Sequence, residues 1–537
     1  MSAAQAAAPR RWGTRVEVGT ANGHPCRMYS ERPHSMGELL LDAQRWADRP
    51  FLVQGERRLT GREHAQAVAR VAKHLRARGV RAGGRVMLLG FNQIDWLVSF
   101  WALQCIGPMV ALGNAWWSPQ ELADATALVD PSFVVMDRKL AKAPFAGDAQ
   151  VIYFDEIRAI AESGESAELT LDPVDEEAPA VVIFSSGTTG QARGVVMSHR
   201  GVIANIHNLM AMTGRLPSDL SPDHPGTVSL VTMPLFHIGG FQVSIMTMLS
   251  GGKVVYLKGK FDALEALEVI QQEKVRAWGS VPTMVSRVLQ HPRFAEFDTS
   301  SVSSVQMGGA PIPYELRASV AQGFPNSSRR VGTMYGLTEV GGVLSMGAGK
   351  DVEGRPGCVG TPLATVEIRI ANPNEEGVGE IMARSPLATA GYLGDGKSLA
   401  DGEGWIPSGD LGRLDDEGRL YVVGRSKDMI IRGGENVASV HVERCLRTHP
   451  KVAEASVVPL PHADLGEEVG AAIVLRPGEE ATVDELTRHA AAQLARFEVP
   501  TRWWITHEPL PTNATGKVVK REVLALWPAQ SEEAVKA

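Results

Sequence analysis

The sequence "IFSSGTTGQARGVVMSH" runs from Ile183 to His199 and opens with an apolar run of the kind that forms a buried strand. A cluster of serine, threonine and glycine residues follows, and then a basic residue, Arg193. Glycines let backbone N–H groups approach an oxygen closely and hydroxyl groups add donors, so this composition is typical of an anion-binding loop. It is not a Walker loop, because no Gly-Lys-Ser/Thr closes it. Taken alone, the pattern also fits an ordinary turn between a strand and a helix.

The composition excludes several classes of protein. With 537 residues the chain is too long for one hydrophobic core, so at least two domains are expected. The chain has 54 Lys and Arg residues and 61 Asp and Glu residues, a net charge of −7. It therefore lacks the basic excess typical of proteins that bind nucleic acid. Four cysteines without metal-like spacing favour a reducing, cytoplasmic compartment.

No membrane span or signal peptide is predicted. The N-terminus lacks the long apolar stretch of a signal peptide. The stretch 98–117, "VSFWALQCIGPMVALGNAWW", is the most apolar, but Gly-Pro and Gly-Asn interrupt it. A buried helix followed by a strand is the better interpretation.

Apolar runs alternating with helical patterns predict an α/β fold. Short buried strands are expected at 84–92, 133–137, 180–186, 228–234, 253–259 and 276–281, with helical patterns between several of them. From about Val366 the texture changes to short strands with turns. The prediction is a large N-terminal domain, residues 1–426, of two layered and mostly parallel sheets plus a small β subdomain. A small α+β C-terminal domain, residues 427–537, is expected to include a helix over 482–497.

Further motifs accompany the opening loop in a fixed order. They are "PLFHIGG" (234–240), "GGAPIP" (308–313), "MYGLTE" (334–339), "GWIPSGDLG" (404–412), "GRSKDMIIRGGENV" (424–437) and "PTNATGKVVKR" (511–521). This series resembles the adenylate-forming superfamily of acyl- and aryl-CoA synthetases, luciferases and peptide-synthetase adenylation domains. The resemblance implies an enzyme that activates a carboxylic acid with ATP and Mg²⁺ as an acyl-adenylate, from which a thiol then displaces AMP.

The resemblance also assigns the nucleotide site residue by residue. The triphosphate loop would comprise Ser185, Ser186, Gly187, Thr188, Thr189, Gly190 and Arg193. The adenine slot would comprise Gly309, Ala310, Pro311, Tyr335 and Gly336, and the ribose would be held by Asp410 and Arg425. Asp410 and Arg425 also fit an ordinary surface ion pair.

Three further residues would act on the reacting groups. Thr338 would bind the α-phosphate, with a helix N-cap as its alternative role. Glu339 would bind Mg²⁺, a hard cation that prefers oxygen ligands. Lys517 would be the catalytic lysine, an ammonium able to bridge carboxylate and phosphate, where the alternative is a solvated lysine in a turn.

The thiol step would use another face of a mobile C-terminal domain. In the superfamily this domain rotates after adenylation. Lys427 matches the hinge, and Gly433 with Gly434 matches the loop along the coenzyme A tunnel. The chain continues only briefly after Lys517, without a fused carrier domain, which favours free coenzyme A as the acceptor. A separate carrier protein remains an alternative.

Small and apolar residues surround the expected acid pocket. They are His237, Gly239, Gly240, Phe241, Gly308, Val340, Gly341 and Gly342. Missing side chains widen a pocket and apolar walls favour a hydrophobic acid, so a long-chain, bulky or ring-containing acid is expected. Alternatively, the glycines serve only tight turns and His237 is a core residue.

Three functions are therefore considered. The first is a complete acyl-CoA synthetase. The second is a thioester-forming half-enzyme that takes its adenylate from a partner enzyme, because Ala192-Arg193 replaces the Pro-Lys usual in the superfamily. The third is a non-catalytic nucleotide-binding protein, which the presence of Lys517, Glu339 and Asp410 speaks against. No oligomeric state is predicted.

Overall fold

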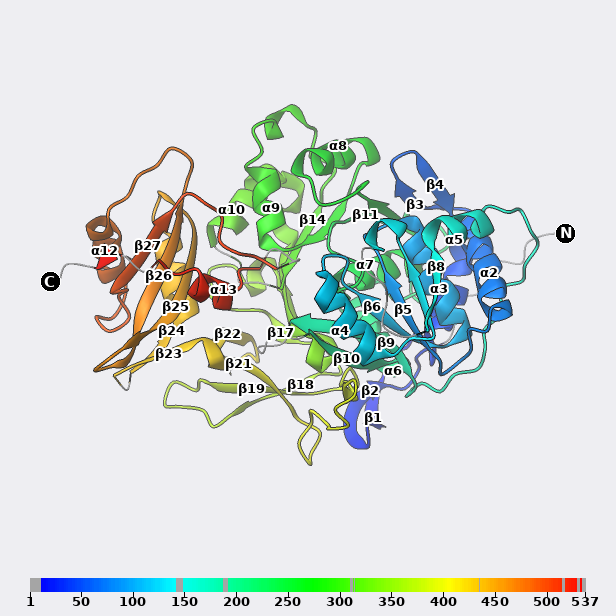
Figure 1. Cartoon of the computed structure of the whole chain (residues 1–537), viewed down its shortest axis with the longest axis horizontal. Helices are drawn as coiled ribbons and strands as arrows, with labels where there is room; N and C mark the ends of the chain where they lie inside the picture. The colour runs from blue at the N-terminus through cyan, green and yellow to red at the C-terminus, as the bar shows by residue number, and fades with distance from the viewer. Residues whose placement is uncertain are drawn as a thin grey trace.

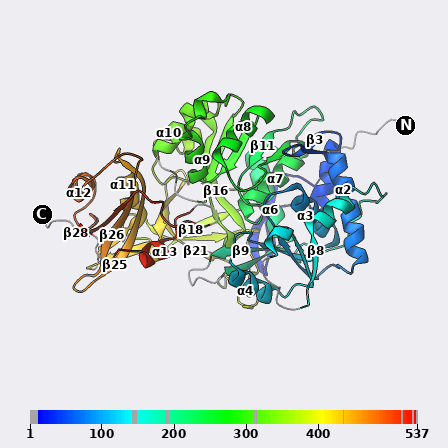
Figure 2. The same cartoon turned by 45° about the horizontal axis from the view of Figure 1, so that its top comes forward.

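The computed structural model describes residues 11–141, 148–186, 192–309, 312, 314–433, 435–513, 517–528 and 532–533. A large N-terminal domain fills the right and centre of Figure 1, and a smaller C-terminal domain stands at its left. The view in Figure 2, turned by 45°, shows the same two parts. This is the predicted α/β architecture.

A seven-stranded sheet lies at the centre of the N-terminal domain. Its strands are β5 (Arg85–Leu89), β6 (Met109–Gly113), β7 (Phe133–Met136), β8 (Gln150–Tyr153), β9 (Pro179–Ser186), β10 (Ala192–Ser198) and β20 (Gly391–Tyr392). Their order is β20-β10-β9-β6-β5-β7-β8. The pairs from β9 to β8 are parallel, whereas β10 is antiparallel to both β9 and β20. The loop after β9 therefore closes a hairpin instead of leading into a helix.

A nine-stranded sheet forms the second layer. Its strands are β3 (Pro50–Gln54), β4 (Arg57–Thr60), β11 (Val228–Val231), β12 (Lys253–Tyr256), β13 (Ala277–Ser280), β14 (Ser304–Gly308), β15 (Val331–Leu337), β16 (Gly342–Ala348) and β17 (Thr361–Pro362). The order is β17-β16-β15-β14-β13-β11-β12-β3-β4. The middle of the sheet is parallel and its two ends are antiparallel.

Helices pack on both sheets. They are α1 (Met36–Ala43), α2 (Gly61–Ala77), α3 (Ile94–Ile106), α4 (Pro119–Val129), α5 (Phe154–Ala161), α6 (His199–Met212), α7 (Ile238–Leu249), α8 (Ala263–Glu273), α9 (Pro282–Leu289) and α10 (Tyr314–Gly323). Short 3-10 turns are η1 (Gln44–Trp46), η2 (Arg138–Leu140), η3 (Phe294–Glu296), η4 (Pro325–Arg330), η5 (Thr338–Val340), η6 (Gly349–Asp351) and η7 (Ser426–Asp428). The predicted buried helix and strand at 98–117 are α3 and β6.

Strand alternation divides the core. Val86 and Leu88 of β5 face the main core, which also contains α1, α3, α6 and α7 and strands of both sheets. Met87 and Leu89 face the opposite side, against α4. Successive strand residues point to opposite faces, so a continuous apolar run is buried on both sides. Within the described part of the chain, no helix has both the length and the apolar character needed to cross a bilayer.

The β subdomain is an antiparallel sheet of four strands, as predicted for the region after Val366. The strands are β18 (Glu367–Ala371), β19 (Gly379–Arg384), β21 (Ile406–Leu414) and β22 (Leu420–Arg425). A hairpin that was not expected, β1 (Val16–Ala21) and β2 (His24–Tyr29), lies at the bottom of Figure 1 near this sheet.

The C-terminal domain has its own sheet and core. Its elements are β23 (Met429–Arg432), β24 (Glu435–Ala438), α11 (Ser439–Arg447), β25 (Val452–His462), β26 (Gly466–Leu475), α12 (Val483–Ala491), β27 (Arg502–Thr506), α13 (Lys520–Ala525) and β28 (Glu532–Glu533). The helix predicted over 482–497 was too long, since α12 ends at Ala491. Beyond it the Ala495 N–H donates to the Glu498 carboxylate, so this stretch forms a separate turn. Leu494 still packs into the core.

Candidate active site

A buried carboxylate lies between three elements of the N-terminal domain. Asp410 of β21 is 6% exposed, and strand pairing sets it directly opposite Arg425 of β22. The Tyr335 hydroxyl donates to Asp410 Oδ2 at 2.8 Å, and Arg425 Nε donates to Oδ1 at 3.0 Å. Burial and the Asp410 charge raise the pKa of Tyr335, which keeps the hydroxyl a donor. A carboxylate has about four acceptor positions, so two remain for a ligand.

Lys517 of the C-terminal domain approaches this pair. Burial of its ammonium group and the Arg425 charge lower its pKa, while Asp410 and Asp428 act in the opposite direction. The Lys517 N–H donates to Asn513 Oδ1 at 3.0 Å, and the Asn513 N–H donates back to the Lys517 carbonyl at 2.8 Å. These two bonds tie the backbone of Lys517 to Asn513, while the Arg425 and Asp410 charges that act on Lys517 belong to the N-terminal domain.

The turn η5 carries the two candidate phosphate and metal residues. Leu337 occupies the N-cap, so Thr338 is the first residue of the turn and does not cap it. The Thr389 hydroxyl donates to the Glu339 carbonyl at 2.9 Å, and the Tyr392 hydroxyl donates to Glu339 Oε1 at 3.5 Å. Glu339 is thus held at both its backbone and its side chain.

The glycines after this turn permit close packing. A Cβ on Gly341, at φ +87°, would lie 1.9 Å from the Leu387 carbonyl oxygen. One on Gly342, at φ +140°, would lie 2.6 Å from Asn205 Oδ1, which accepts from the Val343 N–H at 3.0 Å. A Cβ on either residue would collide with these atoms, and the positive φ disfavours a side chain in any case. Packing thus requires glycine at both positions, and their place at an acid pocket stays a prediction.

Aromatic side chains form a row beside His237. The His237 ring centroid lies 4.8 Å from that of Phe236, which lies 5.3 Å from Trp116, which in turn lies 5.3 Å from Phe91. Trp116 is 38% exposed. Burial lowers the pKa of His237 to about 4, so its imidazole is neutral near neutral pH. We call these four residues the aromatic row.

Other residues expected at the acid pocket lie close to the row or behind it. Gly239 and Gly240 open α7, and a Cβ on Gly240 would meet the Pro234 carbonyl oxygen at 2.1 Å. Phe241 is 1% exposed and packs in the main core, while Val340 is buried in another cluster. Gly308 ends β14.

Flanking residues define the base of the phosphate loop. Ser185 and Ser186 end β9 and pair with Arg193 and Ala192 at the start of β10. The Arg193 guanidinium lies 5.1 Å from the ring centroid of Tyr392. Seven residues predicted for the site, together with others, lie outside the described part: Gly187, Thr188, Thr189, Gly190, Ala310, Pro311 and Gly434.

The predicted adenine and hinge residues fall at element ends. Gly309 follows β14 at φ +78°, and Gly336 is exposed near the end of β15. Lys427 is the middle residue of η7, between β22 and β23. Gly433 lies at the β23–β24 turn, where its N–H donates to the Leu465 carbonyl at 2.8 Å.

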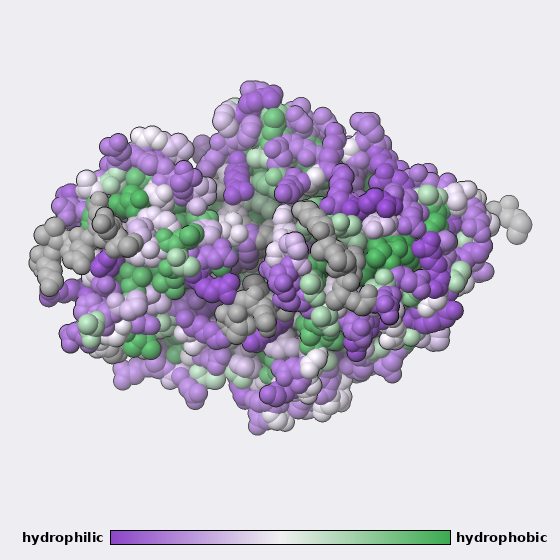
Figure 3. All heavy atoms as spheres, viewed as in Figure 1, coloured by the Kyte–Doolittle hydropathy of each residue, from purple (hydrophilic) through white to green (hydrophobic). Residues whose placement is uncertain are grey.

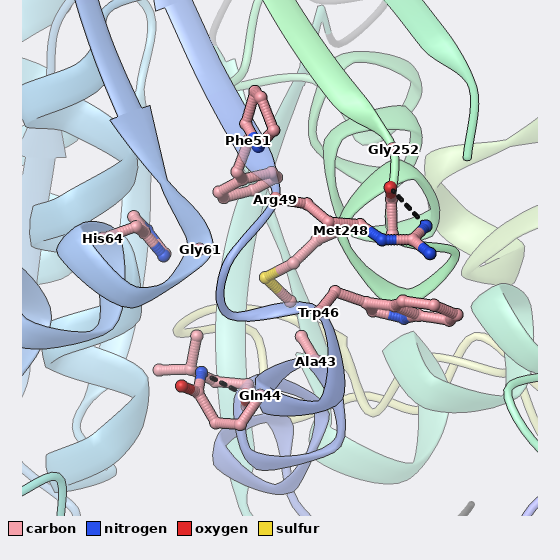
Figure 4. Close-up of a pocket in the computed structure, with 12 residues that line it drawn as sticks. Ala43, Gln44, Trp46, Arg49, Phe51, Gly61, His64, Met248 and Gly252 are labelled. Atoms are coloured by element: carbon pink, nitrogen blue, oxygen red, sulfur yellow. Dashed lines mark hydrogen bonds between the residues drawn. The ribbon is translucent and has the colours of Figure 1, made fainter. Parts of the chain in front are cut away.

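The hollow in Figure 4 lies elsewhere in the N-terminal domain. It has room for about one water molecule, ~20 Å³, between η1, β3 and α7. Trp46, His64 and Met248 line it, and none of the residues predicted for the site does. The face of the molecule seen in Figure 3 is mainly hydrophilic, with scattered hydrophobic areas.

Sequence reasoning missed four residues at this site. Tyr392 and Thr389 contact Glu339 from 53 and 50 positions away. Asn205 joins β16 to α7, since its Nδ2 donates to Gln242 Oε1 at 2.9 Å. Trp116 belongs to the aromatic row. The Gly-Tyr pair at 391–392 follows a turn-rich stretch, which signals a loop but not its contact with Glu339.

Two family models match the chain: AMP-binding enzyme over residues 41–393, and AMP-binding enzyme C-terminal domain over residues 441–517. The chain belongs to the AMP-binding enzyme family. This AMP-binding enzyme is 30% identical to 4-coumarate-CoA ligase 1 of Narcissus pseudonarcissus over 515 residues, covering 90% of this chain and 92% of that protein. It is 33% identical to a feruloyl-CoA synthase of an Amycolatopsis species over 477 residues, covering 87% and 93% of the two chains.

Solved structures agree with this family. The o-succinylbenzoate CoA synthetase of Bacillus subtilis with its acyl-adenylate intermediate is similar at a TM-score of 0.79 and 26% identity, covering 92% of this chain and 99% of that one. That enzyme has also been solved with ATP and a magnesium ion. The present AMP-binding enzyme is therefore an acid–thiol ligase of the AMP-forming, acyl-CoA synthetase kind.

Proposed function

We propose that this enzyme activates a ring-containing carboxylic acid as its acyl-adenylate and transfers the acyl group to coenzyme A. The observation that carries the proposal is the buried, ion-paired Asp410–Arg425 pair of the N-terminal domain, whose charges act on Lys517 of the C-terminal domain. A carboxylate with free acceptor positions suits ribose hydroxyls, and an ammonium beside it suits an attacking carboxylate and a phosphate.

The nucleotide would extend from this pair to η5. Tyr335, Gly309, Ala310, Pro311 and Gly336 would line the adenine, with Asp410 and Arg425 at the ribose. Thr338 would donate to the α-phosphate. The backbone and hydroxyl donors of residues 185–190, with Arg193, would hold the remaining phosphates.

Glu339 fits a magnesium ligand. Its carboxylate offers hard oxygen donors, and Mg²⁺ commonly takes one or two carboxylates together with substrate phosphates. Thr389 and Tyr392 hold the Glu339 backbone and side chain. A bound Mg²⁺ would neutralise part of the triphosphate charge.

The chemistry then follows from positioning and charge. A carboxylate oxygen of the acid bonds to the α-phosphorus as the bond to pyrophosphate breaks, and Lys517 offsets the repulsion between the two anions. In the second step the thiol sulfur of coenzyme A bonds to the acyl carbon, the bond to AMP breaks and the thiol proton is lost. We propose domains of residues 1–426 and 427–537, with Lys427 as the hinge and Gly433 and Gly434 along the thiol path.

The aromatic row supports a ring-containing acid. An aromatic pair contributes about 0.5–1.5 kcal/mol beyond the burial of its area. The row begins at His237, whose neutral imidazole adds no charge to an apolar pocket. Coumarate and ferulate ligases among the relatives are named for ring-containing acids. Four buried, free cysteines fit a reducing cytoplasm as the place of action.

A panel of acids tests the proposal. Arylpropenoic and benzoic acids are compared with straight-chain acids of similar carbon number, each with ATP, Mg²⁺ and coenzyme A, and thioester formation is followed by chromatography. We expect kcat/KM to be at least about 10-fold higher for a ring-bearing acid. Trp116→Ala should reduce that preference. Equal use of the straight-chain acids would contradict the assigned acid class.

Arg193 supports a second candidate function. The Arg193 guanidinium lies over the ring of Tyr392. This planar guanidinium takes the place of the compact lysine ammonium that is usual in the superfamily. In this alternative, adenylation is weak and a partner enzyme supplies the acyl-adenylate for transfer. A misplaced charge beside the phosphates can cost about 100-fold in rate.

The variant Arg193→Lys separates the two candidates. If the loop is impaired, pyrophosphate exchange should rise by about 10-fold or more, while thioester formation from preformed adenylate stays unchanged. If the enzyme is complete, exchange in the unsubstituted protein should match transfer and the variant should not raise it. That second result would end the half-enzyme alternative.

A further inference from the structure

Tyr392 occupies a short edge strand at the rim of the candidate site. Strand β20 pairs with β10, where Tyr392 lies opposite Val195, two residues after Arg193. The backbone of this strand packs closely against the Lys397 carbonyl oxygen, because a Cβ on Gly391 would lie 2.5 Å from that oxygen. Tyr392 therefore stands beside the phosphate loop by backbone pairing.

Two polar side chains, the buried Arg200 and the exposed Asn22, bond to the segment before Tyr392. Arg200, only 1% exposed, donates to the Pro386 carbonyl and to Asn22 Oδ1. Asn22 Nδ2 in turn donates to the carbonyls of Ala388 and Thr389 at 2.8 and 3.1 Å. These bonds fix the backbone that places Tyr392.

The Tyr392 side chain lies between opposite charges. Its hydroxyl donates to Glu339 Oε1 at 3.5 Å, and the Arg193 guanidinium lies 5.1 Å from its ring centroid. The ring attracts the cation through its face, and the hydroxyl reaches the carboxylate.

We propose that Tyr392 is a positioning residue for adenylation that holds the metal-binding carboxylate of Glu339 through its hydroxyl and the phosphate-loop cation Arg193 through its ring. The inference rests on the proposed function, since it takes Glu339 as the Mg²⁺ ligand. One side chain would thus align the metal with the loop that grips the same triphosphate. Acid binding and acyl transfer do not use this contact.

Two substitutions separate the roles of hydroxyl and ring. Tyr392→Phe removes the hydroxyl, which Arg193 also contacts, and keeps the ring face for Arg193, so MgATP affinity should fall about 3- to 10-fold and ATP affinity in EDTA should fall by less. Tyr392→Leu removes both hydroxyl and ring, so ATP affinity in EDTA should fall further. Titration calorimetry of the full chain measures both affinities. The apparent Mg²⁺ requirement of pyrophosphate exchange should rise in Tyr392→Phe, with KM for the acid unchanged.

Tyr421→Phe is the matched control. Tyr421 also donates to a carboxylate, Asp415 Oδ2 at 3.2 Å, and also has an arginine, Arg413, over its ring at 4.2 Å. It is not among the residues of the candidate site, so its loss should leave MgATP affinity unchanged. An equal fall for Tyr392→Phe with and without Mg²⁺, or no fall, would overturn the role of Tyr392 alone. Failure of the unsubstituted protein to bind MgATP would overturn both this role and the proposed function.

Discussion

Lys517 shows how one residue links the two domains chemically. Its backbone is bonded to Asn513 of the C-terminal domain, yet its electrostatic neighbours Asp410 and Arg425 belong to the N-terminal domain. The carboxylate favours the ammonium form while burial and the arginine disfavour it.

Lys517→Ala should reduce acyl-adenylate formation by about 100-fold or more and largely spare thioester formation from preformed adenylate. The reason is that positive charge is needed only where the acid meets the phosphate. Pyrophosphate exchange and single-turnover transfer measure the two steps. An equal loss in both steps would remove Lys517 from its assigned role.

The pH dependence of adenylation provides a second test of Lys517. Its pKa is lowered from the usual lysine value, about 10.4, so the charge is present at low pH and is lost as pH rises through the lowered value. The rate of pyrophosphate exchange should therefore decline at a lower alkaline pH than it would if Lys517 had the pKa of a free lysine. Lys517→Arg should remove that decline, because a guanidinium keeps its proton.

At the scale of an element, the turn η7 is the connection between the domains. It follows β22, which carries Arg425, and leads directly into β23 of the C-terminal sheet. A 3-10 turn of three residues is easily rearranged, since few hydrogen bonds hold it. In the arrangement of Figure 1, α13 lies close to the N-terminal domain, and Lys517 precedes it by three residues.

Lys427→Pro should block transfer to coenzyme A and leave adenylate formation as the surviving step. Proline fixes φ near −65°, which a 3-10 turn accepts, but it prevents the dihedral change that a rotating domain needs. Rapid-quench measurement of adenylate and thioester separates the steps. Lys427→Ala is the control for loss of the side chain alone. A normal transfer rate in the proline variant would place the hinge elsewhere.

At the scale of the molecule, buried histidines make the fold sensitive to acid. Burial lowers the pKa of His64 to about 3 and those of His199 and His207 to about 4. His199 Nδ1 accepts from the Met36 N–H and His207 Nε2 bonds to the Gly13 carbonyl, so these rings join elements of the main core as neutral groups.

We expect the free energy of unfolding to fall as pH decreases from about 6.5 toward 4. In this range the histidines of the unfolded chain bind protons, whereas the buried histidines of the folded chain do not, so acid favours unfolding. Each buried histidine therefore lowers the free energy of unfolding by about 2 kcal/mol at pH 5. His64→Gln should reduce the fall in the thermal midpoint between pH 7 and pH 5, whereas replacement of the exposed His507 by Gln should not. An unchanged midpoint across this range in the unsubstituted protein would contradict the expectation.

Several features of this protein depend on local sequence patterns and can therefore be predicted from the sequence. Apolar runs predict the central strands. Ser35 and Thr482 each stand three residues before a glutamate, a spacing typical of helix N-termini, and each accepts from the backbone N–H of that glutamate as the N-cap of its helix. The order of the motifs was sufficient for the family. The helical periodicity predicted the wrong end for α12, because a separate turn follows Ala491 although the apolar spacing continues.

Only the tertiary structure decided which distant residues meet. In the sequence, the missing side chains of Gly341 and Gly342 suggest a wider acid pocket. In the structure Gly341 lies against the Leu387 carbonyl and Gly342 against the Asn205 side chain. Tyr392 reaches Glu339 because edge pairing and hydrogen bonds from the Asn22 side chain set its loop, and no spacing in the chain encodes that contact. Periodicity records which face of an element is apolar, whereas the partner of a polar side chain depends on packing between elements far apart in sequence.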